Sequence, residues 1–354
     1  MRRIGWMPRS IRIEYDVAFY HVMARGNRRE LIFHDEEDRR TFLRTFGEAC
    51  GMTGWRVHAW VLMSNYYHLL IETPSANLVN GMSWMQNAYT RRFNTRHQMW
   101  GRLFGDRYKA VVVQGDDPNY FGSLLDYLHL NPVRAGMVRP SEGESVGEFD
   151  WSSLAGGYLL PPSRRPRWFE AGMGLATFGC ADTAVGRKRF LRRLDERAVS
   201  EEMERCGEPA SDSEQDARVS RLGRGWYWGS REFAEEQLGA NEKAIEEKKG
   251  RSHRYSEEKR SHDEREAERI VSAAEAAAGL NGVDWQRMSG ADARKVSIAD
   301  VVWRRTTVSQ AWICERLHMS SAANVSQQLR RWKQSPKRKG LPQPLQDVLS
   351  TFDT

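Results

Sequence analysis

The sequence has few cysteines and no long apolar run, and both absences narrow its class. Its 354 residues include four cysteines that form no C-x-x-C pair and no zinc-ribbon spacing: Cys50, Cys180, Cys206 and Cys314. Thiols in a reducing compartment are therefore expected, rather than a disulfide framework or a structural zinc site. No run approaches the roughly 18 apolar residues of a membrane-spanning helix, and the amino terminus lacks the apolar stretch of a secretory signal. We expect a soluble cytoplasmic protein without a membrane partner.

Positive charge is what the sequence has in excess. Lys and Arg number 54 against 47 Asp and Glu, which gives a net charge of +7. Most of these basic residues are Arg, whose planar fork binds phosphate bidentately and stacks on bases. Such a surplus suits a phosphate-rich partner, although charge alone does not separate nucleic acid from an acidic protein. The length favours two domains and a linker.

The first part of the chain alternates between strand and helix patterns. The expected order is strand, helix, strand, strand, helix and strand, over residues 17–25, a helix beginning at Asp35, then 55–62, 67–72, 77–94 and 103–113. This is the split βαβ arrangement. It predicts an α+β fold, with a ferredoxin-like antiparallel sheet and helices on one face.

One strand of that set carries a metal-capable side chain. His68 lies among Val, Leu and Ile residues, and Tyr66 points to the same face because side chains along a strand alternate. A histidine there could hold a divalent metal against a neighbouring helix. For a lone histidine, however, a hydrogen-bonded core residue is the commoner reading.

A second candidate site lies on the helix expected to begin at Asp117 and to stop at Pro132. Tyr127 and Asn131 are four residues apart on it and therefore share one helical face. A core tyrosine with a capping asparagine explains the spacing as well as a functional pair does. Both readings stay open on spacing alone.

Five segments together resemble the REP-associated tyrosine transposases, which are relatives of the insertion-sequence-200-like transposases in the HUH single-tyrosine superfamily. They occur in the order and spacing of that family over about residues 8–160. The segments are Tyr20-His-Val-Met-Ala-Arg-Gly-Asn-Arg28, Ala59-Trp-Val-Leu-Met-Ser-Asn-Tyr-Tyr-His-Leu-Leu70, Leu103-Phe-Gly-Asp-Arg-Tyr-Lys109, Asp126-Tyr-Leu-His-Leu-Asn-Pro-Val-Arg-Ala-Gly136 and Trp151-Ser-Ser153.

The resemblance implies a metal-dependent transposase or endonuclease. Tyr127 would be the nucleophile that cuts DNA and forms a 5′-phosphotyrosine, with Mg²⁺ or Mn²⁺ at the scissile phosphate. The ligand positions of the family fall on Tyr66, His68 and Asn131. Tyr66 departs from the family pattern, which has histidine there, and a phenol with a pKa near about 10 is a poor ligand at neutral pH. From the sequence, His58 and His129 do not replace it.

Basic residues with interleaved aromatics suggest DNA contacts in this part of the chain. Cations follow a backbone and rings stack on unpaired bases, which suits single-stranded or hairpin DNA. For about half of these residues, the alternative explanation holds: the aromatic rings belong to the core and the charged groups lie on a solvated face. The expected DNA-binding residues are Arg25, Arg28, Arg29, Arg91, Arg92, Arg102, Arg107 and Lys109.

The carboxy-terminal part ends in a helix-turn-helix-like pattern. Helices are expected over 295–305, 310–317 and 322–332, with the last one suited to a major groove, whereas a generic helical bundle is the bland alternative. Its candidate base or phosphate contacts are Asn324, Gln327, Gln328 and Arg331. The expected segments are a transposase insertion-sequence-200-like domain (1–160), a basic, charged helical linker region (161–280), the helix-turn-helix-like domain (281–335) and a tail (336–354).

Two functions therefore remain in competition. One is DNA transposition, by cleavage and transfer of single-stranded hairpin DNA through Tyr127. The alternative is a catalytically weakened, domesticated, sequence-specific DNA-binding protein, because position 66 is a tyrosine. An RNA hairpin binder is a weaker third reading. A homodimer and a nucleoid-associated location follow from the resemblance alone.

Overall fold

The computed structural model describes residues 13–204, 226–238, 252–280, 282–306, 308–333 and 341–352. Contacts group the chain into two compact units. The first comprises residues 1–85 and 101–246, and the second comprises 86–100 and 247–354. The boundaries of the four segments expected from the sequence differ from the boundaries of these two units. The four segments stay a prediction.

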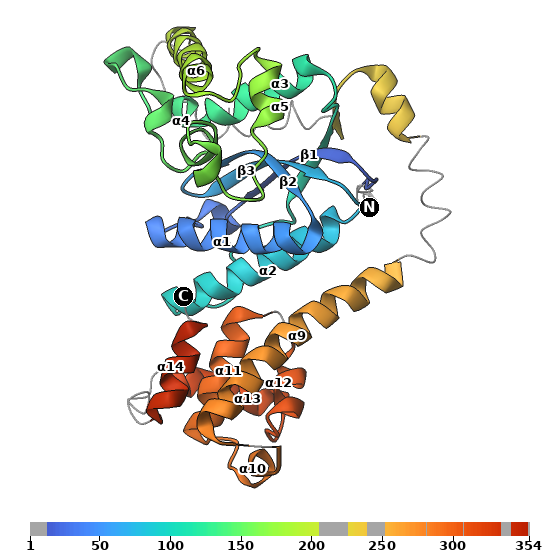
Figure 1. The fold of residues 1–354 in the computed structure, drawn as a ribbon, viewed down its shortest axis with the longest axis vertical. Helices are drawn as coiled ribbons and strands as arrows, with labels where there is room; N and C mark the ends of the chain where they lie inside the picture. Colours follow the sequence, from blue (N-terminus) through green and yellow to red (C-terminus); the bar gives the residue numbers. More distant parts are fainter. Residues whose placement is uncertain are drawn as a thin grey trace, which may run out of the picture. The chain divides into compact units, whose positions relative to one another are not determined.

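The first unit is built on a five-stranded sheet (Figure 1). Four strands pair antiparallel in the order β2-β3-β1-β4, and the short β5 pairs parallel to β4. This confirms the ferredoxin-like expectation, although the last strand of that set is shorter than the predicted 103–113. The strands are β1 (Ala18–Arg25), β2 (Arg56–Leu62), β3 (Tyr66–Thr73), β4 (Lys109–Val113) and β5 (Tyr227–Trp228).

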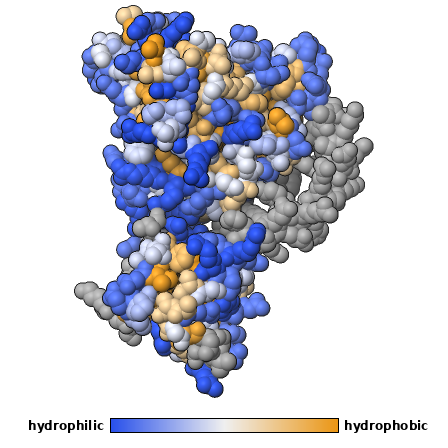
Figure 2. Space-filling view, in the orientation of Figure 1, coloured by the Kyte–Doolittle hydropathy of each residue, from blue (hydrophilic) through white to orange (hydrophobic). Residues whose placement is uncertain are grey.

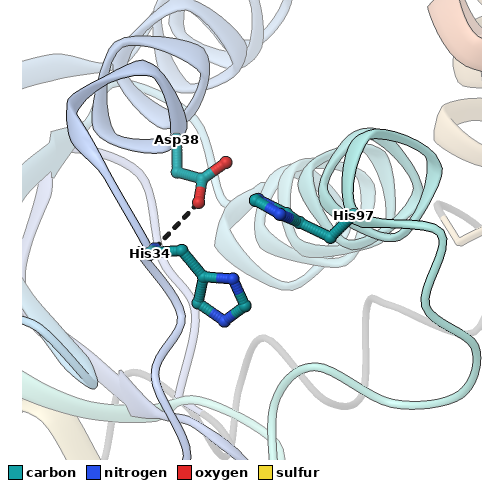
Figure 3. A group of neighbouring side chains, drawn as sticks. All are labelled: His34, Asp38 and His97. Carbon is teal, nitrogen blue, oxygen red and sulfur yellow. Dashed lines mark hydrogen bonds between the residues drawn. The ribbon is translucent and has the colours of Figure 1, made fainter.

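One face of the sheet packs on α1 (Glu36–Thr53). Asp35 caps this helix by accepting a hydrogen bond from the backbone N–H of Asp38. The Asp38 carboxylate in turn accepts from the backbone N–H of His34 at 2.8 Å, which fixes the chain at the helix start (Figure 3). Phe42 of α1 meets Tyr67 of β3, with 4.9 Å between ring centroids. Figure 1 shows α1 and the start of α2 (Leu78–His97) on this side, as the fold class predicts.

The opposite face is covered by helices that follow the ferredoxin-like set (Figure 1). Phe121 of α3 (Pro118–His129) packs against Phe19 and His58 of the sheet. Beyond it come α4 (Asn131–Arg134), α5 (Gly172–Thr177) and α6 (Ala184–Glu204). The segment expected to begin a linker at residue 161 is therefore packed structure as far as α6, with Phe190, Leu194 and Ala198 fully buried.

Short helical turns complete the first unit. They are η1 (Asn27–Arg29), η2 (Pro140–Glu142), η3 (Val146–Glu148), the π-turn η4 (Leu154–Tyr158) and η5 (Pro162–Arg164), together with a helix over residues 231–238.

The second unit is all-helical in its described residues. Its helices are α9 (Ser252–Ala278), α10 (Gly282–Arg287), α11 (Ala293–Arg305), α12 (Gln310–Arg316), α13 (Ala322–Lys333) and α14 (Gln343–Thr351). The last three predicted helices thus fall on α11, α12 and α13 within two residues, and Ser309 caps α12 as its side chain accepts from the Trp312 N–H. The core also takes in Ile270 of α9 and Leu345 of α14, from stretches predicted to be linker and tail.

Figure 2 shows blue side chains over most of the face drawn, with smaller orange areas between them. Among the described helices, none combines the length and the apolar character that a membrane crossing requires.

Candidate active site

Neighbouring strands bring two histidines together on the face covered by α3. His21 lies on β1 opposite Leu70 of β3, and His68 is two residues from Leu70 on the same strand. Side chains two apart on a strand share a face, so the two imidazoles are diagonal neighbours. His21 Nε2 lies 2.9 Å from His68 Nδ1, and the rings stack with centroids 5.0 Å apart.

Burial keeps both imidazoles neutral. The exposed fractions are 1% for His21 and 3% for His68. Desolvation lowers the pKa of His21 to about 3. The pKa of His68 falls well below 6.5 mainly for the same reason. Repulsion from a protonated His21 and from the guanidinium groups of Arg25 and Arg134 would lower it further. Within such a neutral pair, one ring donates its N–H to the lone pair of the other, so each ring fixes the tautomer of its neighbour.

Tyr127 lies across this pair. It comes from α3, is half-buried, and meets both imidazoles edge-on at 5.9 Å from His21 and 5.7 Å from His68. On the α4 side, the Arg134 guanidinium lies 4.8 Å from the Tyr127 ring centroid and donates to the Tyr127 carbonyl at 2.8 Å. The phenol ring therefore contacts both a neutral imidazole pair and a cation.

Tyr66 and Asn131 are bonded to each other at the same site. The Tyr66 hydroxyl donates to Asn131 Oδ1 at 3.0 Å. Asn131 Nδ2 donates to the Tyr127 carbonyl at 3.2 Å, so the amide joins the strand residue to the tyrosine helix. The Arg25 guanidinium lies 5.0 Å from the Tyr66 ring centroid. The residue that departs from the family pattern is thus part of the site.

These groups open into a cavity of about 380 Å³ that is rich in positive charge. Its lining includes Tyr66, His68, Tyr127 and Asn131, together with five cations and one acid, namely Arg25, Arg28, Arg29, Arg107, Lys109 and Asp106. Within the described residues, the side chains of Arg28, Arg107 and Lys109 make no hydrogen bond or ion pair. The cavity therefore offers cationic groups that protein acids do not neutralise.

A tight loop after β1 presents two of these arginines. Arg28 and Arg29 both have left-handed backbone angles, with φ of 53° and 64°. Gly26 starts the loop, and a Cβ there would lie 2.0 Å from the Glu30 carbonyl oxygen, so only glycine fits. Asn65 anchors the loop by donating to the Arg29 carbonyl at 3.0 Å.

One family of known proteins matches part of this chain. Residues 15–128 match the family described as "Transposase IS200 like". This part of the chain is therefore similar to the IS200-like transposases. One similar solved structure is titled "Structure of the REP associates tyrosine transposase bound to a REP hairpin". It shares 14% identity, covers 42% of this chain and 84% of its own, and has a TM-score of 0.35. No curated protein matches the chain.

The first unit does not gather all the residues expected to bind DNA around the cavity. Arg102 is exposed but lies outside the cavity lining. Arg91 and Arg92 belong to the part of α2 that is assigned to the second unit. There Arg91 donates to the Trp303 and Thr306 carbonyls and stacks on Trp303, with 3.7 Å between its guanidinium carbon and the ring centroid.

The expected contacts on α13 differ in their exposure. Gln327 and Arg331 are exposed, and Asn324 is half-buried. Gln328 is only 9% exposed and packs inward. Gln328 is therefore the one of these four side chains that is too buried to contact a DNA groove.

His21 is the site residue that the sequence did not reveal as one. His21 lies in the family-like segment from Tyr20 to Arg28. Its contact with His68, however, depends on which residue of β3 lies opposite it. Neither His58 nor His129 takes that place. His58 Nε2 pairs with the Glu72 carboxylate at 3.1 Å, and His129 Nε2 with Ser153 Oγ at 2.8 Å.

The donor set at this cavity fits a weakly held divalent cation. His68 supplies a neutral imidazole and Asn131 an amide oxygen, and both face the cavity. Mg²⁺ usually keeps several waters and needs only one or two protein ligands beside phosphate oxygens. The Tyr66 hydroxyl, however, already donates to the Asn131 oxygen. Metal binding therefore competes with this hydrogen bond.

Proposed function

We propose that Tyr127 cleaves single-stranded DNA and retains one product as a 5′-phosphotyrosine, which makes this chain a transposase-type DNA strand transferase. The observation that carries the proposal is the placement of Tyr127, half-buried at a cavity lined by five cations. A phosphodiester has the complementary charge, and a tyrosine oxygen is a nucleophile for phosphorus.

The reaction balances as a transesterification. The Tyr127 oxygen forms a bond to phosphorus and loses its proton, the bond from phosphorus to the 3′ oxygen breaks, and the leaving 3′ oxygen takes up a proton. Rejoining reverses these steps on a second 3′ hydroxyl, so the energy of the phosphodiester bond is conserved in the phosphotyrosine.

The residues of the cavity have distinct roles in this proposal. Arg28, Arg107 and Lys109 bind the backbone phosphates, while Arg134 holds the Tyr127 carbonyl and ring. His68 and Asn131 would hold the divalent cation, Mg²⁺ or Mn²⁺. When bound, that cation would offset charge developing on the phosphate oxygens. His21 orients His68 through their shared hydrogen bond.

The second unit supplies a further DNA contact in the proposal. Exposed Gln327 and Arg331 on α13 suit a base edge and a phosphate, as in a helix-turn-helix. The proposed substrate is therefore single-stranded DNA next to a hairpin stem. We also infer a cytoplasmic, nucleoid-associated protein that acts as a homodimer.

Covalent capture tests the proposal directly. A 3′-labelled single-stranded oligonucleotide with a hairpin is incubated with the protein and Mn²⁺, and the products are separated on a denaturing gel. Wild type should give a labelled protein adduct and Tyr127→Phe none. Tyr120→Phe is the matched control, because Tyr120 lies on the same helix outside the cavity lining. An adduct in Tyr127→Phe would reject Tyr127 as the nucleophile.

The bond between Tyr66 and Asn131 favours a second candidate, a DNA-binding protein with weakened catalysis. The hydroxyl engages the one amide oxygen that would ligate the metal. In that case wild type binds the hairpin without forming an adduct, whereas Tyr66→His forms one. An adduct in wild type would exclude this second candidate.

A further inference from the structure

Helix α6 approaches the tyrosine helix with three charged side chains at helical spacing. Arg193, Arg197 and Glu201 are four residues apart, so they follow one face of α6. A second row, Phe190, Leu194 and Ala198, is fully buried and anchors the helix in the first unit. The charged row is thereby held at a fixed distance from α3 and α4.

The two arginines of this row hold the residue before the nucleophile. The side chain of Asp126 is 1% exposed, and it accepts from Arg193 Nη1 at 3.0 Å and from Arg197 Nη1 at 2.7 Å. Arg193 is itself held in place by Phe178, with 3.5 Å between the guanidinium carbon and the ring centroid. Two guanidinium groups therefore hold a buried carboxylate directly beside Tyr127.

Glu201 holds the cation that touches the nucleophile. Its carboxylate takes both Nε and Nη2 of Arg134 in a fork, the second at 2.8 Å. The remaining Nη1 of Arg134 donates to the Tyr127 carbonyl, and the guanidinium faces the phenol ring. The side chains of Arg134 and Glu201 are only 10% and 14% exposed, so water competes little for this fork.

We propose that α6 positions Tyr127 for catalysis, with Glu201 orienting Arg134 against the phenol and with Arg193 and Arg197 fixing Asp126 beside it. The proposal rests on the proposed role of Tyr127 as nucleophile. It extends the catalytic module beyond residues 15–128, which match the family, to a helix that lies outside that match. Arg134 and Glu201 are positioning residues, because neither needs to touch the DNA.

The contacts favour positioning over simple packing. Three separate points fix one turn of α3, since Asp126 is held at its side chain and Tyr127 is held at both its carbonyl and its ring. A packing role would need only the apolar row of α6. The phenol ring also contacts His21 and His68, so a loss of Arg134 orientation should move the ring relative to the imidazoles.

The test uses full-length protein with 3-fluorotyrosine at position 127. Fluorine NMR reports the surroundings of the ring without any catalysis, and the rate of adduct formation is measured on the same variants. Glu201→Gln should shift or broaden the fluorine line and slow adduct formation about 10- to 100-fold, with unchanged affinity for the oligonucleotide. Glu202→Gln is the matched control, because Glu202 accepts from the Ser141 N–H instead. It should change neither quantity.

A second variant covers the case in which Glu201→Gln does not fold. Arg134→Met combined with Glu201→Leu replaces the buried pair by apolar groups, which proteins often tolerate. It should fold, shift the fluorine line and slow adduct formation. An unchanged line in the folded variant, or equal changes in Glu202→Gln, would overturn the proposal. A shifted line without adduct in any protein, wild type included, would support positioning by α6 and reject the proposed catalytic function.

Discussion

At the scale of single residues, we predict that Tyr66 limits how well the proposed site holds a metal. Its hydroxyl donates to Asn131 Oδ1, which is a prospective ligand atom. Tyr66→His adds an imidazole and removes that donor, so Mn²⁺ affinity of the DNA-free protein should rise by at least about 10-fold. Tyr66→Phe only frees the amide oxygen and should give a smaller rise. Electron paramagnetic resonance of Mn²⁺ measures both, and equal affinity in all three proteins would contradict this role of Tyr66.

His129 makes the stability of the first unit sensitive to acid. Burial, aided by the charge of Arg193, lowers the pKa of His129 to about 3. The unfolded chain takes up a proton near pH 6.5 while the folded chain does not, so protons favour unfolding between pH 6.5 and 3. Each such histidine removes about 1.4 kcal/mol of unfolding free energy per pH unit in that window.

Urea unfolding between pH 7 and 4 tests this linkage. His129→Gln cannot take up the proton, so its unfolding free energy should fall less steeply with acid than that of wild type. Parallel curves for wild type and His129→Gln would show that His129 does not set the acid sensitivity.

The sequence pointed to the candidate site residues that stand in a local motif and missed one that does not. Tyr127 and Asn131 are one helical turn apart, so local spacing places them on one face. The structure brings His68 to them, because all three line one cavity. His21 was not predicted as a site residue because its contact with His68 depends on the register between β1 and β3. The residues of either strand alone do not determine which residue of β3 pairs with His21.

At the scale of elements, α13 carries the prediction for the second unit. Arg331 is exposed and suits a phosphate, whereas Gln327 is exposed and suits a base edge. Arg331→Ala should weaken hairpin binding for every sequence and reduce the salt slope by about 1. Gln327→Ala should weaken only the preferred sequence, by about 1–3 kcal/mol. Fluorescence anisotropy over a range of salt measures both, and unchanged binding in both variants would favour a generic helical bundle.

Helices with a strong apolar stripe were easier to predict than helices with small core residues. Ile313, Leu317 and Val325 made the stripe of α12 and α13 visible in the sequence, and all three are buried. The buried face of α9 includes Ala267 and Ala274 within a run of Glu, Lys and Arg, so its periodicity is weak. Tertiary packing, which the local pattern does not contain, gives that helix its place in the core.

At the scale of the whole molecule, the first unit extends well past the family match at residue 128. Its core takes in Phe190 and Leu194 of α6, and its sheet takes in β5. The segment 86–100, by contrast, is grouped with the second unit. Sequence motifs mark where the chemistry lies, but the boundary of a folding unit depends on contacts between distant segments.

Truncation tests that boundary. A chain ending at residue 160 loses α6 and leaves its apolar and charged partners exposed, so it should unfold without a cooperative transition. A chain ending at residue 246 keeps the first unit as the contacts define it. It should melt cooperatively and form the Tyr127 adduct, while losing the DNA affinity that α13 contributes. Calorimetry and adduct capture on both chains decide the matter. Cooperative melting of the shorter chain would mean that α6 is dispensable for the fold, so the unit would end where the linker was first expected.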